Sequence, residues 1–362
     1  MADSEEFKSA LSVNSGIHQP PNINPDALKH LSRRRKKKYS TGQYIEAILA
    51  GDRTILSQAI TLVESNNSDD ADIAHSIVEQ CLPFSSKSIR IGITGSPGAG
   101  KSTFIETFGK LITEEGRKLA VLAIDPSSER TRGSILGDKT RMERLGNDPN
   151  AFIRPTPSSG TLGGVARRTR ETIILFEAAG FDTILVETVG VGQSETTASS
   201  MVDFFLLLQL AGAGDELQGI KRGIMEMADT IAITKADGNN FTSAERAKIE
   251  FQNALHLYPP KPSGWRPNVV ACSSFENLGI REIWDSINCY MDFTTKSGYF
   301  EEKRKQQAII RMHDAIIEQL KDLFYNSEEI KKMKPEIEKQ LREGSITSYK
   351  AALSMLNKYF KK

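Results

Sequence analysis

One loop motif constrains this chain more than any other part of its sequence. Residues 89–94 form a short run rich in β-branched side chains, and residues 95–102 follow with the pattern Gly-x-x-x-x-Gly-Lys-Ser. The residues after this pattern have the apolar spacing of a helix. A strand, a glycine-rich loop and a helix in this order form a P-loop, which cradles the phosphates of a nucleotide. The motif therefore predicts an α/β nucleotide-binding fold.

The residue types in this loop suit a polyphosphate. Gly95, Gly98 and Gly100 allow the backbone to curve with its N–H groups pointing inward, and the N-terminus of the next helix adds partial positive charge. Lys101 is predicted to reach the β- and γ-phosphates and to act in catalysis, and the Ser102 hydroxyl is predicted to bind Mg²⁺. The predicted phosphate-binding residues are Gly95, Ser96, Pro97, Gly98, Ala99, Gly100, Lys101, Ser102 and Thr103.

The middle of the chain alternates buried strands with helices. Candidate strands cover residues 89–94, 119–124, 152–154, 183–187, 204–210, 230–234 and 269–272. Nearly continuous apolar runs with intervening helices are typical of a mostly parallel sheet covered on both faces. Ligands bind at the carboxyl ends of the strands in such sheets. The polar residues that follow each strand are therefore the candidate site residues.

Composition divides the chain into four predicted segments. Residues 1–38 are a polar leader with a basic run at 33–38, which fits a solvated arm better than a nucleic-acid patch. Residues 39–86 predict two or three helices packed on the P-loop domain, which covers residues 87–293. Residues 294–362 predict a helical arm with an apolar stripe formed by Ile309, Met312, Ile316, Leu320 and Phe324. We expect these apolar side chains to be buried, either against the parent domain or against a second subunit in a homodimer.

The charge balance and the cysteines narrow the class of protein. The 47 basic and 46 acidic residues nearly cancel, which gives no support for nucleic acid or an anionic membrane as the main partner. No run approaches the roughly 18 to 20 apolar residues of a membrane span.

Cys81, Cys272 and Cys289 lack C-x-x-C spacing, so we expect them to be reduced thiols. The N-terminus lacks a secretory core and is too acidic for a transit peptide, so the cytoplasm is predicted.

Carboxylates near strand ends predict a Mg²⁺ site. Asp125 follows the run 119–124, Glu187 ends the run 183–187, and Asp138 lies in a Gly-Asp-Lys-Thr turn. Carboxylates suit a hard cation that keeps several of its waters. The glycine-rich loop after Glu187 contains Gln193, which either orients an attacking water or is a polar hinge residue.

The tetrapeptide Thr234-Lys235-Ala236-Asp237 follows another strand and predicts base recognition. The Asp237 carboxylate can accept from both the N1–H and the exocyclic amine of guanine, whereas adenine offers no such donor pair. The stem of Lys235 can lie along the base plane. Backbone N–H groups near Ser273 and Ser274 are predicted to meet the guanine O6. The sequence thus predicts GTP or GDP, with Mg²⁺, as the bound nucleotide.

These residues together resemble one family, the methylmalonyl-CoA mutase-associated G-protein chaperones, formerly described as arginine/ornithine transport ATPases. These belong to the wider group of metallochaperone-type GTPases. The matching blocks are residues 95–102, 125–128, 133–142, 157–164, 187–195 and 212–221. The family usually carries Asn where this chain has Thr234, which puts the connection between the base motif and the P-loop in doubt. It often carries Ser-Ala in place of Ser273-Ser274.

The resemblance implies a homodimeric, Mg²⁺-dependent GTPase. Such a protein docks on an adenosylcobalamin-dependent acyl-CoA mutase, gates cofactor loading from its adenosyltransferase, and protects or reactivates it. In the family the Mg²⁺ site involves the positions matching Ser102, Asp125, Asp138 and Glu187. Lys221 lies in a loop similar to the family's third switch, where it is either a solvated charge or a cation near the γ-phosphate.

Three other functions fit parts of the sequence. A nickel-delivery GTPase would need metal-holding tracts, and the five scattered histidines and three isolated cysteines argue against it. A transport-coupled kinase or ATPase for basic amino acids would use ATP, which Asp237 disfavours. A purely structural G-domain is disfavoured because the predicted phosphate and metal groups are intact.

Overall fold

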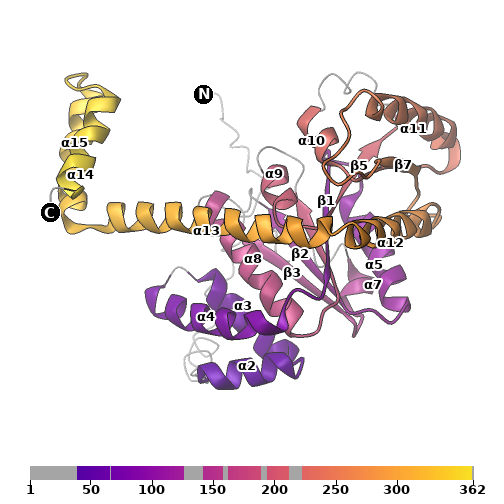
Figure 1. Ribbon diagram of the computed structural model, residues 1–362, viewed down its shortest axis with the longest axis horizontal. Helices are drawn as coiled ribbons and strands as arrows, with labels where there is room; N and C mark the ends of the chain where they lie inside the picture. Colours follow the sequence, from indigo (N-terminus) through magenta and orange to yellow (C-terminus); the bar gives the residue numbers. More distant parts are fainter. Residues whose placement is uncertain are drawn as a thin grey trace, which may run out of the picture. The chain divides into compact units, whose positions relative to one another are not determined.

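The structure is a computed structural model that describes residues 39–65, 67–125, 142–157, 162–188, 194–211 and 222–360. Residues 41–362 form a single compact unit through their internal contacts. The centre of this unit is a seven-stranded sheet in the order β3-β2-β4-β1-β5-β6-β7 (Figure 1). The strands are β1 (Ile89–Gly95), β2 (Leu119–Asp125), β3 (Ala151–Pro157), β4 (Thr183–Thr188), β5 (Phe204–Leu210), β6 (Thr230–Thr234) and β7 (Asn268–Ala271).

Every neighbouring pair in this sheet is parallel, as the apolar runs predicted. All seven predicted strands are present, and β5 and β6 have the predicted bounds. The strand β3 is longer than predicted, and β7 begins and ends one residue earlier. The predicted α/β fold class is therefore confirmed, and the carboxyl ends of all seven strands meet at one edge.

Helices cover both faces of the sheet. The helices around it are α5 (Lys101–Glu114), α7 (Glu143–Gly146), α8 (Leu162–Ala178), α9 (Ser194–Ser199), α10 (Arg222–Met227), α11 (Phe241–Leu255) and α12 (Ile280–Lys296), with the short 3-10 turn η2 (Gly238–Asn240). On one face Phe104 and Phe108 of α5 and Trp284 of α12 pack on Leu206 of β5. On the other face Met225 of α10 and Phe251 of α11 join Leu207, Ile231 and Val269. Successive residues of β5 thus point into opposite layers.

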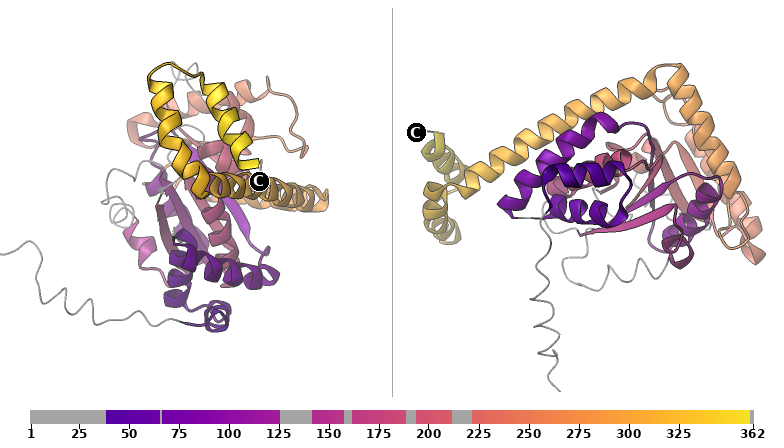
Figure 2. Two further views of the ribbon diagram at one scale, coloured as in Figure 1. Left: turned by 90° about the vertical axis from the view of Figure 1, so that its left-hand side faces the viewer. Right: turned by 90° about the horizontal axis from the view of Figure 1, so that it is seen from below.

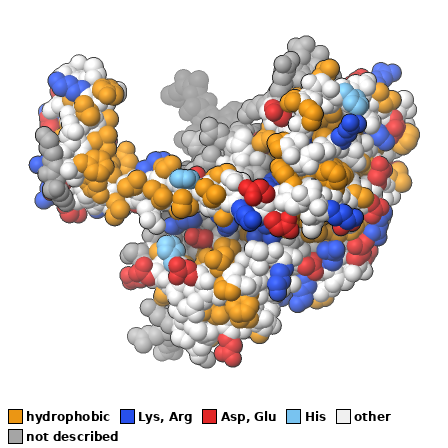
Figure 3. All heavy atoms as spheres, viewed as in Figure 1, with side chains coloured by type: hydrophobic (Ala, Val, Ile, Leu, Met, Phe, Trp, Pro, Cys, Tyr) orange, Lys and Arg blue, Asp and Glu red, His pale blue; other side chains and the backbone are white. Residues whose placement is uncertain are grey.

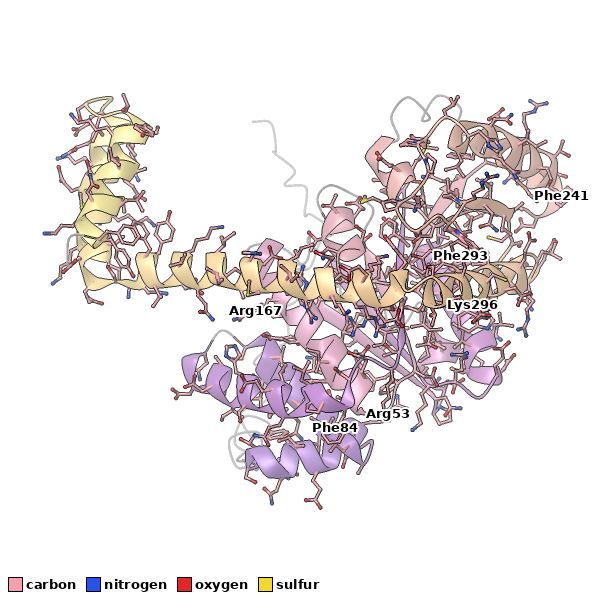
Figure 4. The ribbon with its side chains drawn as sticks, viewed as in Figure 1. Arg53, Phe84, Arg167, Phe241, Phe293 and Lys296 are labelled. Atoms are coloured by element: carbon pink, nitrogen blue, oxygen red, sulfur yellow. The ribbon has the colours of Figure 1, made fainter. Side chains whose placement is uncertain are left out.

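Three helices precede the sheet, namely α2 (Thr41–Leu49), α3 (Arg53–Glu64) and α4 (Ser68–Cys81), followed by the 3-10 turn η1 (Leu82–Phe84). The Asp52 carboxylate caps α3 by accepting from the backbone N–H groups of Thr54 and Ile55 at 2.8 and 3.0 Å. Glu64, at the end of α3, forms an ion pair with Arg154 of β3. Arg53 donates to the carbonyls of Pro149 and Ala151 beside the same strand (Figure 4). The N-terminal helices are therefore joined to the edge of the sheet.

A buried ion network lies at the amino ends of the strands. Arg90 of β1 and Glu177 of α8 form a two-pronged ion pair with both nitrogen–oxygen distances at 2.9 Å. The Glu177 carboxylate also accepts from the Ser88 hydroxyl at 2.5 Å and the Ser86 backbone at 2.8 Å. Both charged side chains are buried, at 8% and 0% exposed. The network therefore fixes β1 to α8.

The C-terminal arm starts from this network. The 28-residue helix α13 (Tyr299–Asn326) carries Arg304, which donates to both carboxylate oxygens of Asp203 at 2.9 and 2.7 Å. Asp203 in turn accepts from the backbone N–H of Arg90 at 2.8 Å. Figure 2 shows α13 extending away from the sheet, with α14 (Glu328–Arg342) and α15 (Ser348–Phe360) at its far end.

The apolar stripe of the arm is largely uncovered by the described residues. Its members Ile309, Met312, Ile316 and Leu320 are 47–53% exposed. A groove of about 590 Å³ separates the end of α13 from α14 and α15, and it is lined mainly by apolar side chains. Hydrophobic side chains follow α13 and the neighbouring side of the terminal helices (Figure 3).

Two further predictions concern the chain as a whole. All three cysteines are free, with Cys81 and Cys272 buried and Cys289 exposed, as their spacing predicted. Within the described ranges, none of the helices combines the length and apolar character needed to cross a bilayer.

Candidate nucleotide-binding site

The predicted phosphate loop connects β1 to α5. Gly95 ends β1 in close contact with β5, where a Cβ would overlap the Leu208 carbonyl oxygen. Gly98 and Gly100 have φ of 83° and 81°, in the left-handed region that side chains with a Cβ disfavour. Gly100 is the N-cap of α5, and the next residue, Lys101, starts the helix. The loop thus has the strand, turn and helix geometry that places backbone N–H groups and a helix N-terminus around an anion.

Lys101 folds back over this loop. Its Nζ donates to the carbonyls of Gly95 and Ser96 at 2.8 and 3.2 Å. Burial lowers the pKa of Lys101, and the nearby carboxylates of Glu187 and Glu195 oppose that shift. A partly desolvated ammonium group therefore lies within the loop, where the phosphates of a nucleotide would offer it acceptors.

The predicted Mg²⁺ residues come from neighbouring elements. Ser102 is the second residue of α5, Asp125 ends β2, and Glu187 is the second-last residue of β4. The strands β2, β4 and β1 are consecutive in the sheet, and Glu187 pairs in register with Ile93 of β1. Among the described side chains, His, Cys, Asp and Glu residues form no cluster of three that holds a metal.

Several predicted site positions lie outside the described residues. These are Asp138, Gln193 and Lys221, together with the side chain of Asp125. A hydroxyl and carboxylates at the ends of adjacent strands are nevertheless a donor set that fits Mg²⁺. Glu187 pairs in register with Ile93, two residues before Gly95, so β4 brings this residue to the start of the phosphate loop.

Two buried threonines join β1 and β4 just before their loops. The Thr188 hydroxyl donates to the Thr94 hydroxyl at 2.9 Å, and both residues are almost inaccessible to solvent. Thr94 precedes the phosphate loop, and Thr188 precedes the glycine-rich loop that contains Gln193. The sequence analysis missed this contact. The available signal was a threonine at the end of the predicted strand 89–94 and another directly after the predicted strand 183–187, but the adjacency of these strands depends on strand order.

The base motif is connected to the phosphate loop through Thr234. The Thr234 hydroxyl lies 2.8 Å from the Ala99 carbonyl and 3.0 Å from the Gln209 carbonyl, with its hydrogen available to either. Ala99 lies within the phosphate loop, and Gln209 is on the adjacent strand β5. The doubt raised by finding threonine instead of asparagine is therefore resolved, because the shorter side chain still makes this connection.

Thr234→Val should weaken this part of the fold. The substitution keeps the branched shape but leaves two buried carbonyls without the donor, at a cost of about 1–3 kcal/mol. Urea unfolding of the nucleotide-free protein measures the loss, with Thr234→Ser as the variant that keeps the hydroxyl. Equal stability of the valine variant and the wild type would show that the contact contributes nothing.

The other base-recognition residues converge at the same edge. The Ser273 hydroxyl donates to the Asp237 carboxylate at 2.5 Å, which links the end of β6 to the loop after β7. Lys235 has φ of 58°, a left-handed backbone conformation that is uncommon for this residue type. Its Cε would lie 4.0 Å from a Cβ placed on Gly100, so the lysine stem runs over the phosphate loop. On α5, the Thr107 hydroxyl donates to the Ser274 carbonyl at 3.1 Å.

The fold and this site define a P-loop nucleotide-binding protein with a parallel α/β sheet. The model of the family described as "Methylmalonyl Co-A mutase-associated GTPase MeaB" matches residues 56–329. The chain belongs to this GTPase family, which confirms the resemblance drawn from the sequence blocks.

Curated relatives and a solved structure agree with this assignment. A probable GTPase of Mycobacterium tuberculosis is 47% identical over 310 residues, which cover 86% of this chain and 92% of the relative. GTPase ArgK of Escherichia coli is 48% identical over 78% of this chain and 86% of its own. The mouse "methylmalonic aciduria type A homolog, mitochondrial" is 44% identical over 87% and 78%. The crystal structure of an LAO/AO transport system kinase aligns with a TM-score of 0.69 and 35% identity, covering 89% of this chain and 98% of that chain.

Proposed function

We propose that this chain hydrolyses GTP to GDP and phosphate with Mg²⁺ and serves as a chaperone for an adenosylcobalamin-dependent acyl-CoA mutase. In this role it binds methylmalonyl-CoA mutase or a related mutase, gates cofactor loading from an adenosyltransferase, and protects or reactivates the enzyme. The observation that carries the proposal is the contact of Thr234 with Ala99. This contact joins the phosphate loop to the start of the segment that carries Asp237, the residue proposed to bind guanine. The chain also belongs to a family named for the mutase.

The proposed binding steps follow from the side chains present. Residues 95–103 surround the phosphates, and Lys101 exchanges its contacts with the loop carbonyls for the β- and γ-phosphate oxygens. The Asp237 carboxylate, oriented by the Ser273 hydroxyl, accepts from the guanine N1–H and amine. Backbone groups at Ser273 and Ser274 meet the guanine O6.

Hydrolysis requires charge stabilisation around the γ-phosphate. Ser102, Asp125, Asp138 and Glu187 would hold Mg²⁺, which supplies positive charge that neutralises the phosphate oxygens. Gln193 is the proposed residue that orients the attacking water, and Lys221 the proposed cation that stabilises the transition state. Turnover by the chain alone should be slow, because such switches usually depend on a partner to complete this stabilisation.

The arm supports the proposal of a homodimer. Residues 294–362 expose the apolar stripe along α13 together with the groove against α14 and α15. Burying such a surface against a second copy would remove apolar area from water at a gain of about 25 cal/mol per Å². We accordingly propose residues 39–86 as a helical segment, 87–293 as the GTPase domain and 294–362 as the dimerisation arm.

A mixing experiment tests the chaperone function. The purified chain is combined with methylmalonyl-CoA mutase, and separately with isobutyryl-CoA mutase, in the presence of GTP and Mg²⁺. Co-elution on gel filtration and faster phosphate release with one mutase are the expected results. A chain that binds GTP but neither co-elutes with nor responds to any cobalamin-dependent mutase would contradict the chaperone role while leaving the GTPase assignment intact.

Asp237→Asn should change the base preference. Asparagine supplies an amide donor for the C2 carbonyl of xanthine, whereas guanine has an amine there, so the preference for GTP over xanthosine triphosphate should fall. Calorimetric titration with both nucleotides measures the ratio of the two dissociation constants. Asp292→Asn, on the exposed side of α12, is the control and should leave the ratio unchanged. An unaltered ratio in Asp237→Asn would remove this residue from base recognition.

A further inference from the structure

The loop after β7 is held firmly beside the proposed base site. Ser273 and Leu278 exchange backbone hydrogen bonds at 2.9 and 3.0 Å, which closes a short hairpin over residues 274–277. The Ser273 hydroxyl accepts from the Glu276 N–H at 3.1 Å, and Asn277 has φ of 56°. The bond from Thr107 to the Ser274 carbonyl adds an anchor on α5. The hairpin is therefore fixed to the strand, to α5 and, through Ser273, to Asp237.

The tip of this hairpin presents an aromatic ring to solvent. Phe275 is 92% exposed, which makes it the most exposed large apolar side chain in the described part of the chain. Within the same part, its ring has no stacking or cation contact. Fully burying a phenylalanine side chain is worth about 1.5–3 kcal/mol. The fold of this chain gains almost none of that, even though the loop that holds the ring is rigid.

The contacts of Ser273 place this hairpin beside the proposed base site. Asp237 defines where the hydrogen-bonding edge of guanine lies, and the stem of Lys235 lies on the side of the phosphate loop, near Gly100. Phe275 is two residues after Ser273, whose hydroxyl contacts the Asp237 carboxylate. A base bound at Asp237 would therefore have the segment of Lys235 and the hairpin of Phe275 as its neighbours.

We propose that Phe275 forms the second wall of the base pocket by stacking its ring on the face of guanine opposite the stem of Lys235. This inference rests on the proposed GTP binding and adds a residue to it. Stacking of a base on an aromatic side chain contributes affinity without distinguishing one base from another, because every base has a π face. Phe275 should therefore set how tightly purine nucleotides bind, while Asp237 sets which purine is preferred.

The test separates the base from the phosphates. Phe275→Ala should weaken GDP binding by about 5- to 150-fold, the range typical of lost base stacking. Its affinity for pyrophosphate with Mg²⁺ should match the wild type, since pyrophosphate has no base. The ratio of affinities for guanosine and inosine diphosphates should also stay unchanged. Leu257→Ala is the control, because this side chain is 88% exposed but lies between α11 and β7, outside the proposed pocket.

A fluorescent variant gives a direct readout of the contact. In Phe275→Trp, emission from the new indole should be quenched by GDP and not by pyrophosphate. Both variants should fold as well as the wild type, because Phe275 is 92% exposed. The stacking role alone would be overturned by the following combination of results. The wild type binds GDP, Phe275→Ala binds GDP with unchanged affinity, and GDP does not quench the emission of Phe275→Trp. Failure of the wild type itself to bind GDP would overturn the proposed function, and the stacking role with it.

Discussion

Lys101→Ala is expected to abolish tight GTP binding. The Lys101 ammonium group lies inside the phosphate loop, 2.8 Å from the Gly95 carbonyl, and is partly desolvated. Truncating one partner of a buried, hydrogen-bonded charge pair costs about 2–5 kcal/mol, which corresponds to roughly 30- to several-thousand-fold in affinity. Calorimetric titration of the variant with GTP and Mg²⁺ measures the loss.

The same variant should fold normally. Burial lowers the pKa of Lys101, so its charged form is less favourable in the folded protein than in water, and its removal relieves that cost. The free energy of unfolding without nucleotide should therefore stay within about 1 kcal/mol of the wild type. Lys296→Ala, in the last turn of α12, is a matched control that should bind GTP normally (Figure 4). Unchanged GTP affinity in Lys101→Ala would refute the phosphate-site assignment.

Glu177→Gln should produce the largest loss of stability. The substitution keeps the shape of the side chain but leaves the buried Arg90 guanidinium without its carboxylate partner. Breaking a buried ion pair from one side costs about 3–5 kcal/mol, because an uncompensated charge remains in a medium of low polarity. Urea unfolding of the nucleotide-free protein measures the effect as a lower midpoint with an unchanged slope.

A surface ion pair in the same chain provides the comparison. Glu343 lies 4.0 Å from Lys339 at the end of α14, and both side chains are more than half exposed. Glu343→Gln should cost no more than about 0.5 kcal/mol, because solvent screens such pairs. Similar small losses in the Glu177 and Glu343 variants would show that the buried network does not hold β1 to α8.

The sheet could be predicted because its strands are buried on both sides. The run 204–210, for example, is apolar at nearly every position, and the structure gives β5 the same bounds. The edge strand β3 was predicted too short, and the part beyond the predicted end contains Pro155 and Pro157. Proline is tolerated in a strand at the edge of a sheet, where its missing N–H is not needed. Being at an edge is a property of strand order, which the sequence does not display.

The candidate site also has one part that the sequence predicts and another that depends on strand order. The phosphate loop follows from a contiguous motif whose residues act together. The contact of Thr234 with Ala99 joins positions 135 apart in the chain, and the pair of Arg90 and Glu177 joins positions 87 apart. Such contacts depend on which strands become neighbours and on their register. The sequence therefore indicated which chemistry is present but not which side chains connect its parts.

The strand β1 has a mechanical consequence for the molecule. Its start is bound to Asp203, which also holds the base of α13, and its last residue opens the phosphate loop. At about 3.3 Å per residue, the five steps from Arg90 to Gly95 span roughly 17 Å of strand, paired with β4 over residues 89–93 and with β5 over residues 91–95. A displacement of α13 would therefore act on the start of β1 through Asp203, and β1 leads directly into the phosphate loop.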